Sequence, residues 1–193
     1  MNLLYKSTRD AEKTVTASQA ILKGLADDGG LFVPVSIPKL PVSLGELKEM
    51  TYQEIAYTVM KEFLTDFTEE ELKSCIAKAY DSKFDTEEIA PLAKVEDAYY
   101  LELFHGATIA FKDMALSILP HLLATSAKKN QVKDEIVILT ATSGDTGSCT
   151  CRICRCRRNQ DHRILSEERS QPRTGAADGN TERRQYFCCC DPR

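Results

Sequence analysis

The first 147 residues of this 193-residue chain contain a single arginine, and the residues after Gly147 contain no lysine, valine or methionine. The first part has fourteen lysines and one of the eight cysteines, whereas the last part has ten arginines and the other seven cysteines. A domain boundary can shift composition, but it rarely exchanges one basic residue type for the other so completely. The chain therefore joins two kinds of sequence at Gly147.

Long apolar runs are also lacking. No stretch approaches the eighteen or so apolar residues of a membrane helix, so a membrane span is not expected. The N-terminal residues contain no continuous apolar segment followed by small residues, which argues against a secretory signal and for the cytosol. The net charge of −4 and the hydrophobic content of 42% are ordinary for a globular protein of one domain, or of one domain with a small appendage.

Three helices are predicted in the first part, at places where a threonine stands three residues before a glutamate or glutamine. This spacing is that of a capping box, and it occurs at Thr16, Thr51 and Thr68. Apolar residues follow each threonine at helical spacing. The first helix is expected to end at Gly29-Gly30. The segment 31–41 is expected to be extended, because prolines interrupt it.

The next segment predicts a strand, a helix and a second strand. The strand is expected at 99–104, the helix at about 112–126 with a kink at Pro120, and an apolar, β-branched strand at 135–140. This order predicts a βαβ unit within a parallel sheet. From Ser148 onward no helical or strand periodicity persists, so the tail is expected to be disordered.

Ser143 to Gly147, with the sequence SGDTG, is a candidate anion-binding loop, because it follows the apolar strand and contains two glycines. Backbone N–H groups in such a loop can turn toward an anion, and a following helix would add its positive end. An ordinary strand-to-helix turn capped by Asp145 explains the pattern equally well. The loop is not a Walker A motif, since no Gly-Lys-Ser/Thr follows.

Lys112 is a second candidate, because it lies among apolar residues at the predicted start of a helix. The positive helix end and partial burial both favour the neutral amine, which a lysine needs in order to attack a carbonyl group. The alternative is a solvated lysine in the first turn. His105 likewise is either a catalytic group or a hydrogen-bonded structural residue.

In combination these motifs resemble those of threonine synthases. Leu103 to Asp113 reads LFHGATIAFKD and is followed by a helix, a strand and TATSGDTG up to Gly147. At the N-terminus, STRD at 7–10 and AILKGLADDGGLFVP at 20–34 resemble the N-terminal domain of that family. The resemblance covers about residues 1–147. One departure is Ala107, where the family usually has proline.

The resemblance implies an α/β fold, namely the three-layer, parallel-sheet fold of type II pyridoxal-phosphate enzymes, which is like the tryptophan synthase β subunit. The fold would be incomplete here and would follow a small N-terminal α/β domain. The implied boundaries are 1–93 for the N-terminal domain, 94–147 for the start of the cofactor-binding catalytic domain, and 148–193 for a disordered tail.

The resemblance also implies a cofactor, pyridoxal 5'-phosphate, and a reaction, the conversion of O-phospho-L-homoserine and water to L-threonine and phosphate. Lys112 would bind the cofactor covalently and act as acid and base. The other implied cofactor-binding residues are Phe111 and Asp145, and the implied substrate-binding residues are Thr142, Ser143, Gly144, Thr146 and His105. The only expected partner is the small-molecule substrate, with no nucleic acid, no membrane and no metal.

The tail allows three interpretations: a metal site, a nucleic-acid-binding arm and a shifted reading frame. Cys151 and Cys154 have zinc-knuckle spacing, with Cys156 and His162 as further ligands, but no second Cys-x-x-Cys is present. The arginines could contact nucleic-acid phosphates, although no aromatic residue is interleaved among them. A disulfide framework conflicts with a cytosolic location.

The third interpretation, a shifted reading frame, explains the change of composition. Codons permitted by the residues from Ser148 onward, read one base later, give AALAGFADVEGTKIIVFYP. This reading restores lysine and valine and resembles the continuation of threonine synthases. We therefore expect a frameshift after Gly147 and little or no activity for the 193-residue chain. The alternative is a non-enzymatic fragment with a zinc- or nucleic-acid-binding tail.

Overall fold

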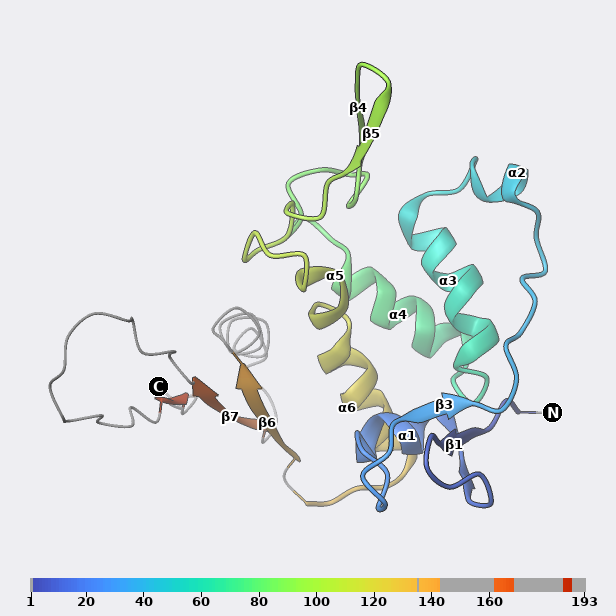
Figure 1. The fold of residues 1–193 in the computed structure, drawn as a ribbon, viewed down its shortest axis with the longest axis vertical. Coiled ribbons are helices and arrows are strands. Elements are labelled where there is room, and N and C mark those ends of the chain that lie inside the picture. The colour runs from blue at the N-terminus through green and yellow to red at the C-terminus, as the bar shows by residue number, and fades with distance from the viewer. Residues whose placement is uncertain (1, 135, 143–161, 169–185, 189–193) are drawn as a thin grey trace, which may run out of the picture.

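The computed structural model describes residues 2–134, 136–142, 162–168 and 186–188, which form a mixed α/β structure (Figure 1). None of its described helices is long and apolar enough to cross a membrane. The elements in chain order are β1 Tyr5–Ser7, β2 Thr14–Val15, α1 Ala17–Lys23, β3 Phe32–Pro34, α2 Leu44–Leu47, α3 Tyr52–Phe63, α4 Glu69–Ala79, β4 Leu92–Val95, β5 Ala98–Leu101, α5 Asp113–Leu116, α6 Leu119–Lys129, β6 Ile136–Thr142, β7 His162–Glu168 and β8 Tyr186–Cys188.

The three predicted capping boxes are confirmed. At Thr16, Thr51 and Thr68 the threonine hydroxyl accepts a backbone N–H three residues on, and the side chain there accepts the threonine N–H in return. The predicted end of the first helix is wrong: α1 ends at Lys23, and Gly24 follows it with a φ of 70°. Glycine adopts this left-handed region without the steric cost that a β-carbon imposes, so the chain turns five residues before the predicted stop.

The N-terminal strands form a small antiparallel sheet in the order β2-β1-β3. In Figure 1 the helices α3 and α4 lie above these strands, and together with α6 they contribute most of the main core. Among its most buried members are Leu72, Ile76 and Ala79 of α4, each at most 2% exposed. Leu122 of α6 belongs to the same cluster, so helices far apart in the sequence share one core.

Polar contacts tie α6 to elements far away in the sequence. The Asn130 side chain donates to Ser18 Oγ at 3.0 Å, across 112 residues. Lys129 Nζ lies 2.9 Å from Glu71 Oε2, and both side chains are partly buried. Helices α1 and α4 are therefore held in place by residues that come much later in the chain.

The predicted βαβ unit is wrong in its first strand. The segment 99–104 contributes β5, which pairs antiparallel with β4 in an isolated two-stranded sheet. Among the described strands β5 does not join β6. Only two residues, Glu96 and Asp97, connect β4 to β5, and such a short connection produces a hairpin. The hairpin projects away from the helices at the top of Figure 1.

The predicted helix at 112–126 is two helices. Pro120 lies in the first turn of α6, where its missing N–H costs no helical hydrogen bond, so the proline starts a new helix instead of kinking a continuous one. The predicted strand at 135–140 is confirmed as β6, which pairs in parallel with β7. Strands β7 and β8 occupy part of the tail, where the sequence predicts disorder.

Candidate functional site

Lys112 lies at the start of α5, as the sequence predicts, and its side chain is half-buried. Its Nζ is 4.7 Å from the centroid of the Phe111 ring, and Phe111 itself is 62% exposed. No carboxylate among the described residues forms an ion pair with this amine. Helix α5 has only four residues, so its dipole contributes less at Lys112 than the predicted long helix would.

The loop that leads to Lys112 is fixed by the next residue, Asp113, whose side chain is fully buried. The two Asp113 carboxylate oxygens accept the Thr108 N–H at 2.7 Å and the Thr108 hydroxyl at 2.6 Å. Charge-assisted hydrogen bonds of this kind are among the stronger ones in proteins. The loop is therefore closed on itself from Thr108, four residues before Lys112, to Asp113, directly after it.

Gly106 at the start of this loop leaves no room for a side chain. A β-carbon there would lie 2.5 Å from both Cβ and Oδ2 of Asp113. Ile109 has a φ of 62°, a strained value for a β-branched residue. The Ile109 N–H donates to the Gly106 carbonyl at 3.0 Å, which holds this turn. Close packing and hydrogen bonding thus define a single path for the backbone up to Lys112.

His105 is held between two carboxylates. Its Nδ1 lies 2.5 Å from Asp85 Oδ1, and its Nε2 lies 3.0 Å from Glu102 Oε2. These hydrogen bonds, with Glu102 the larger contributor and Asp85 the second, raise the pKa of His105 above its ordinary value. The Asp85 N–H also donates to the His105 carbonyl at 3.1 Å. Because both ring nitrogens are engaged, His105 fastens the loop to the 81–90 segment, and in this arrangement it presents no free nitrogen to a ligand.

The structure brings three of the predicted site residues together in one loop, namely His105, Phe111 and Lys112. Thr142 is the last residue of β6, of which the backbone is described. Ser143, Gly144, Asp145 and Thr146 lie outside the described residues, so the predicted approach of this segment to Lys112 stays a prediction. Asp113 and Thr108 were missed as functional residues, although both stand inside the motif that singles out Lys112.

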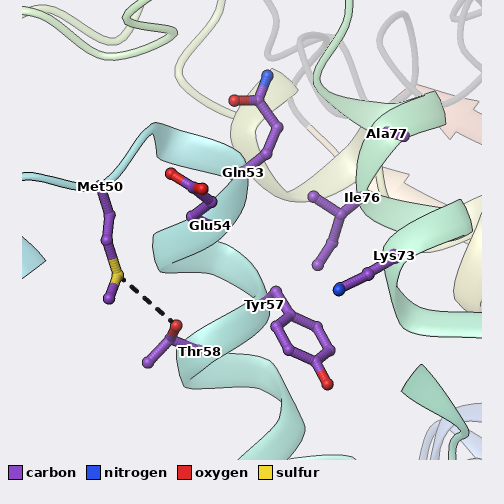
Figure 2. A pocket seen from close by; sticks show the side chains of 8 residues that line it. All are labelled: Met50, Gln53, Glu54, Tyr57, Thr58, Lys73, Ile76 and Ala77. Atoms are coloured by element: carbon purple, nitrogen blue, oxygen red, sulfur yellow. Dashed lines mark hydrogen bonds between the residues drawn. The ribbon is translucent and has the colours of Figure 1, made fainter. Parts of the chain in front are cut away.

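A cavity of about 410 Å³ lies between α3 and α4 (Figure 2), and no residue of the Lys112 loop lines it. Figure 2 shows the Lys73 side chain of α4 pointing toward the Tyr57 ring of α3, and Lys73 Nζ is 5.0 Å from the ring centroid. The remaining lining residues are Met50, Gln53, Glu54, Thr58, Ile76 and Ala77. None of the predicted site residues lines this cavity.

No group of three or more His, Cys, Asp or Glu side chains in the described part of the chain could hold a metal ion. The zinc-knuckle cysteines of the tail, Cys151, Cys154 and Cys156, lie outside the described residues.

Comparison with known proteins gives consistent results over most of the chain. Residues 4–80 match the family model of the threonine synthase N terminus. The threonine synthase of Schizosaccharomyces pombe is 40% identical over 154 residues, which cover 75% of this chain and 30% of that protein. The threonine synthase of Pseudomonas aeruginosa is 36% identical over 164 residues, which cover 83% of this chain and 34% of that protein.

Solved structures agree with this result. A pyridoxal-phosphate-bound threonine synthase from Brucella melitensis superposes with a TM-score of 0.75 at 29% identity, over 86% of this chain and 35% of that chain. The yeast threonine synthase superposes with a TM-score of 0.74 at 32% identity, over 84% of this chain and 35% of that chain. The fold is thus that of the matched part of these type II enzymes. The chain spans about a third of the length of the relatives it matches, and it belongs to the threonine synthase family.

Proposed function

We propose that this chain is the N-terminal part of a pyridoxal-phosphate-dependent threonine synthase, which converts O-phospho-L-homoserine and water to L-threonine and phosphate. The observation that carries the proposal is the environment of Lys112. Its amine has no carboxylate partner among the described residues and stands at the end of a loop fixed by Asp113 and Thr108. A lysine that must bind an aldehyde needs such a free amine in a defined position.

The residues present fit the cofactor. The Lys112 amine supplies the nucleophile, and the exposed Phe111 ring beside it supplies an apolar surface for a planar ring. When bound, pyridoxal phosphate supplies the electron sink for carbanion chemistry, and the protein supplies positioning and proton transfer. We assign the cofactor-side contacts of Asp145 and the substrate-side contacts of Thr142, Ser143, Gly144 and Thr146 from the family resemblance alone.

Within this site each described residue has a separate task. Lys112 Nζ holds the cofactor and moves protons. His105, paired with Asp85 and Glu102, shapes the pocket by fixing the first residue of the loop. Phe111 bounds the pocket on its apolar side. Asp113 keeps the loop closed through Thr108, so it acts on Lys112 through the backbone.

We also propose that the chain is a fragment whose residues after Gly147 are read out of frame, and that the 193-residue product has little or no synthase activity. The change at this point from fourteen lysines and one arginine to ten arginines and no lysine supports the proposal. The boundaries at residues 93 and 147 and a cytoplasmic location remain predictions of the same kind. Sequencing the DNA downstream of Gly147 tests the frameshift. Codons that cannot give the shifted reading would contradict it.

Covalent capture tests the role of Lys112. We expect that incubation with pyridoxal phosphate, reduction with borohydride and peptide mass spectrometry will place most of the label on Lys112. Lys112→Ala should remove that label, whereas Lys128→Ala, at an exposed lysine on α6, should leave it unchanged. Label distributed evenly over the lysines, or absent from Lys112, would contradict the proposal.

Zinc analysis of the same preparation tests the alternative. A non-enzymatic fragment with a metal-binding tail would retain about one zinc per chain, and we expect none.

A further inference from the structure

Tyr80 directly follows helix α4 and is almost fully buried, at 7% exposed. A buried hydroxyl group in a protein nearly always has a hydrogen-bond partner, and the Tyr80 hydroxyl donates to the Met114 carbonyl at 2.8 Å. Met114 belongs to α5, the helix that begins directly after Lys112. This hydrogen bond therefore joins the end of α4 to the candidate site (Figure 1).

Helix α5 needs such an anchor. It has only four residues, and so short a helix is not stable by itself. The carbonyls at the end of a helix have no partner within it, and the Tyr80 hydroxyl supplies one for Met114. The Met114 side chain also packs against the main core. The Lys112 carbonyl accepts the N–H of Ala115 at 3.1 Å and that of Leu116 at 2.9 Å, so the turn that Tyr80 holds includes the Lys112 backbone.

Tyr80 is itself held on all sides. Its N–H donates to the Ile76 carbonyl at 2.9 Å, and its own carbonyl accepts from Gln53 Nε2 at 2.8 Å. Its ring meets that of Tyr52 edge to face, with the centroids 4.9 Å apart. Burial, with Tyr52 as the smaller cause, raises the pKa of Tyr80 above its ordinary value, so the hydroxyl keeps its proton and remains a donor. The phenol is therefore a fixed point from which α5 is held.

We propose that Tyr80 is a positioning residue for Lys112: its hydroxyl holds the α5 backbone so that the Lys112 amine meets pyridoxal phosphate in the orientation that covalent capture requires. Asp113 and Thr108 fix the loop before Lys112, and Tyr80 fixes the turn after it. A displacement of about 1 Å can slow a reaction about a hundredfold, so an anchor two residues from the lysine matters to its reactivity. The inference deepens the proposed function and rests on it.

Tyr5 provides the matched control. Its hydroxyl donates to the Phe63 carbonyl at 2.9 Å, at the end of α3. Tyr80→Phe and Tyr5→Phe each keep the aromatic ring and remove one hydrogen bond from a hydroxyl to a helix carbonyl. Only the Tyr80 bond involves α5. A purely structural role of the two hydroxyls therefore predicts equal effects at Lys112, and a positioning role of Tyr80 predicts unequal ones.

Capture with pyridoxal phosphate and borohydride in the 193-residue chain tests the inference. Peptide mass spectrometry gives the label on Lys112 relative to that on the exposed Lys128 in the same sample. Tyr80→Phe should lower this ratio about fivefold, the factor that corresponds to one neutral hydrogen bond, and Tyr5→Phe should leave it unchanged. Equal ratios in the wild-type chain and Tyr80→Phe, or equal losses in the two variants, would overturn the inference.

A small reagent separates position from access. Acetic anhydride acetylates an exposed amine without a defined orientation, so acetylation of Lys112 should differ by less than about twofold between the wild-type chain and Tyr80→Phe. A loss of acetylation as large as the loss of captured cofactor would show that the substitution changes access to the amine. That result would overturn a positioning role for Tyr80.

Hydrogen exchange gives a measurement without the cofactor. The Ala115 and Leu116 amides donate to the Lys112 carbonyl, and they should exchange about fivefold faster in Tyr80→Phe but not in Tyr5→Phe. Unchanged exchange in Tyr80→Phe would overturn the inference. A wild-type chain that takes up no cofactor label at Lys112 would contradict the proposed function and this inference with it. A labelled wild-type chain with an equally labelled Tyr80→Phe would contradict the inference alone.

Discussion

Gly106→Ala tests whether the Lys112 loop is fixed by close packing. The new methyl group would sit 2.5 Å from Cβ and Oδ2 of the fully buried Asp113. Either the backbone moves, at an overpacking cost of about 1–3 kcal/mol, or Asp113 moves and weakens a charge-assisted hydrogen bond to Thr108 worth about 1.5–3 kcal/mol. We expect a loss of about 3 kcal/mol in the free energy of unfolding.

Urea unfolding at neutral pH measures this loss. With a slope of about 2 kcal/mol per molar urea, the midpoint should fall by about 1.5 M. Gly45→Ala, inside α2, is the matched control, because its β-carbon would meet only Ser43 Oγ at 3.8 Å. Replacing glycine by alanine within a helix should be neutral or slightly stabilising. A Gly106→Ala midpoint within about 0.3 M of wild type, or an equal loss in Gly45→Ala, would refute the packing argument.

Two further predictions concern ion pairing and capping. The pKa of His105 is raised in the folded state by its two carboxylate partners, so its contribution to stability is fully present below the unfolded pKa of about 6.5 and is lost as pH rises through the folded pKa. The difference in melting temperature between wild type and His105→Gln should therefore shrink as pH rises from about 5.5 to 8.5. A constant difference would contradict the pairing of charged His105 with Asp85 and Glu102. Thr68→Ala removes the cap of α4 and should cost about 1 kcal/mol in urea unfolding. Ser74→Ala, at an exposed position in the same helix, should cost nothing, and equal losses would show that capping is not the cause.

Local signals predicted the helix starts well. A capping box involves two residues three apart, so Thr51 and Thr68 carry the information for their own helix ends. The same spacing from Ser43 to Glu46 begins α2, which was missed because a four-residue helix has no room for an apolar periodicity. The end of α1 was misplaced because Gly24, which was passed over, takes the left-handed conformation five residues before Gly29.

Pairing between segments was predicted less well. The strand at 98–101 has its partner at 92–95, and the two-residue connection Glu96-Asp97 was the signal for a hairpin. The order of a strand, a helix and a second strand indicated a parallel βαβ unit instead. An apolar sequence favours a strand, but it does not show which neighbouring strand pairs with it.

At the candidate site, too, local features were predicted and contacts between distant segments were not. The motif around Lys112 places the amine correctly at the start of a helix. The partners of His105 could not be predicted, because Asp85 is twenty residues away and reaches the ring only through the fold. The closure of the loop by Asp113 and Thr108 is a local contact, and its spacing could have been noticed beside Lys112.

The tail differs from its prediction in a specific way. The shifted reading places its apolar run, IIVFY, at positions 161–165, and β7 covers 162–168 in parallel with β6. A strand at this place is what a βαβ unit continued from β6 requires. The shifted reading itself stays a prediction, and the DNA sequence is its test.

The hydrogen bond from Asn130 to Ser18 has a consequence for synthesis on the ribosome. Helix α1 emerges early, but the side chain that secures it is added 112 residues later. At about 5–20 residues per second, the nascent helix waits roughly 6–20 s for its partner. During that interval the N-terminal segment lacks its final packing, so it is exposed to chaperones and proteases before α6 arrives.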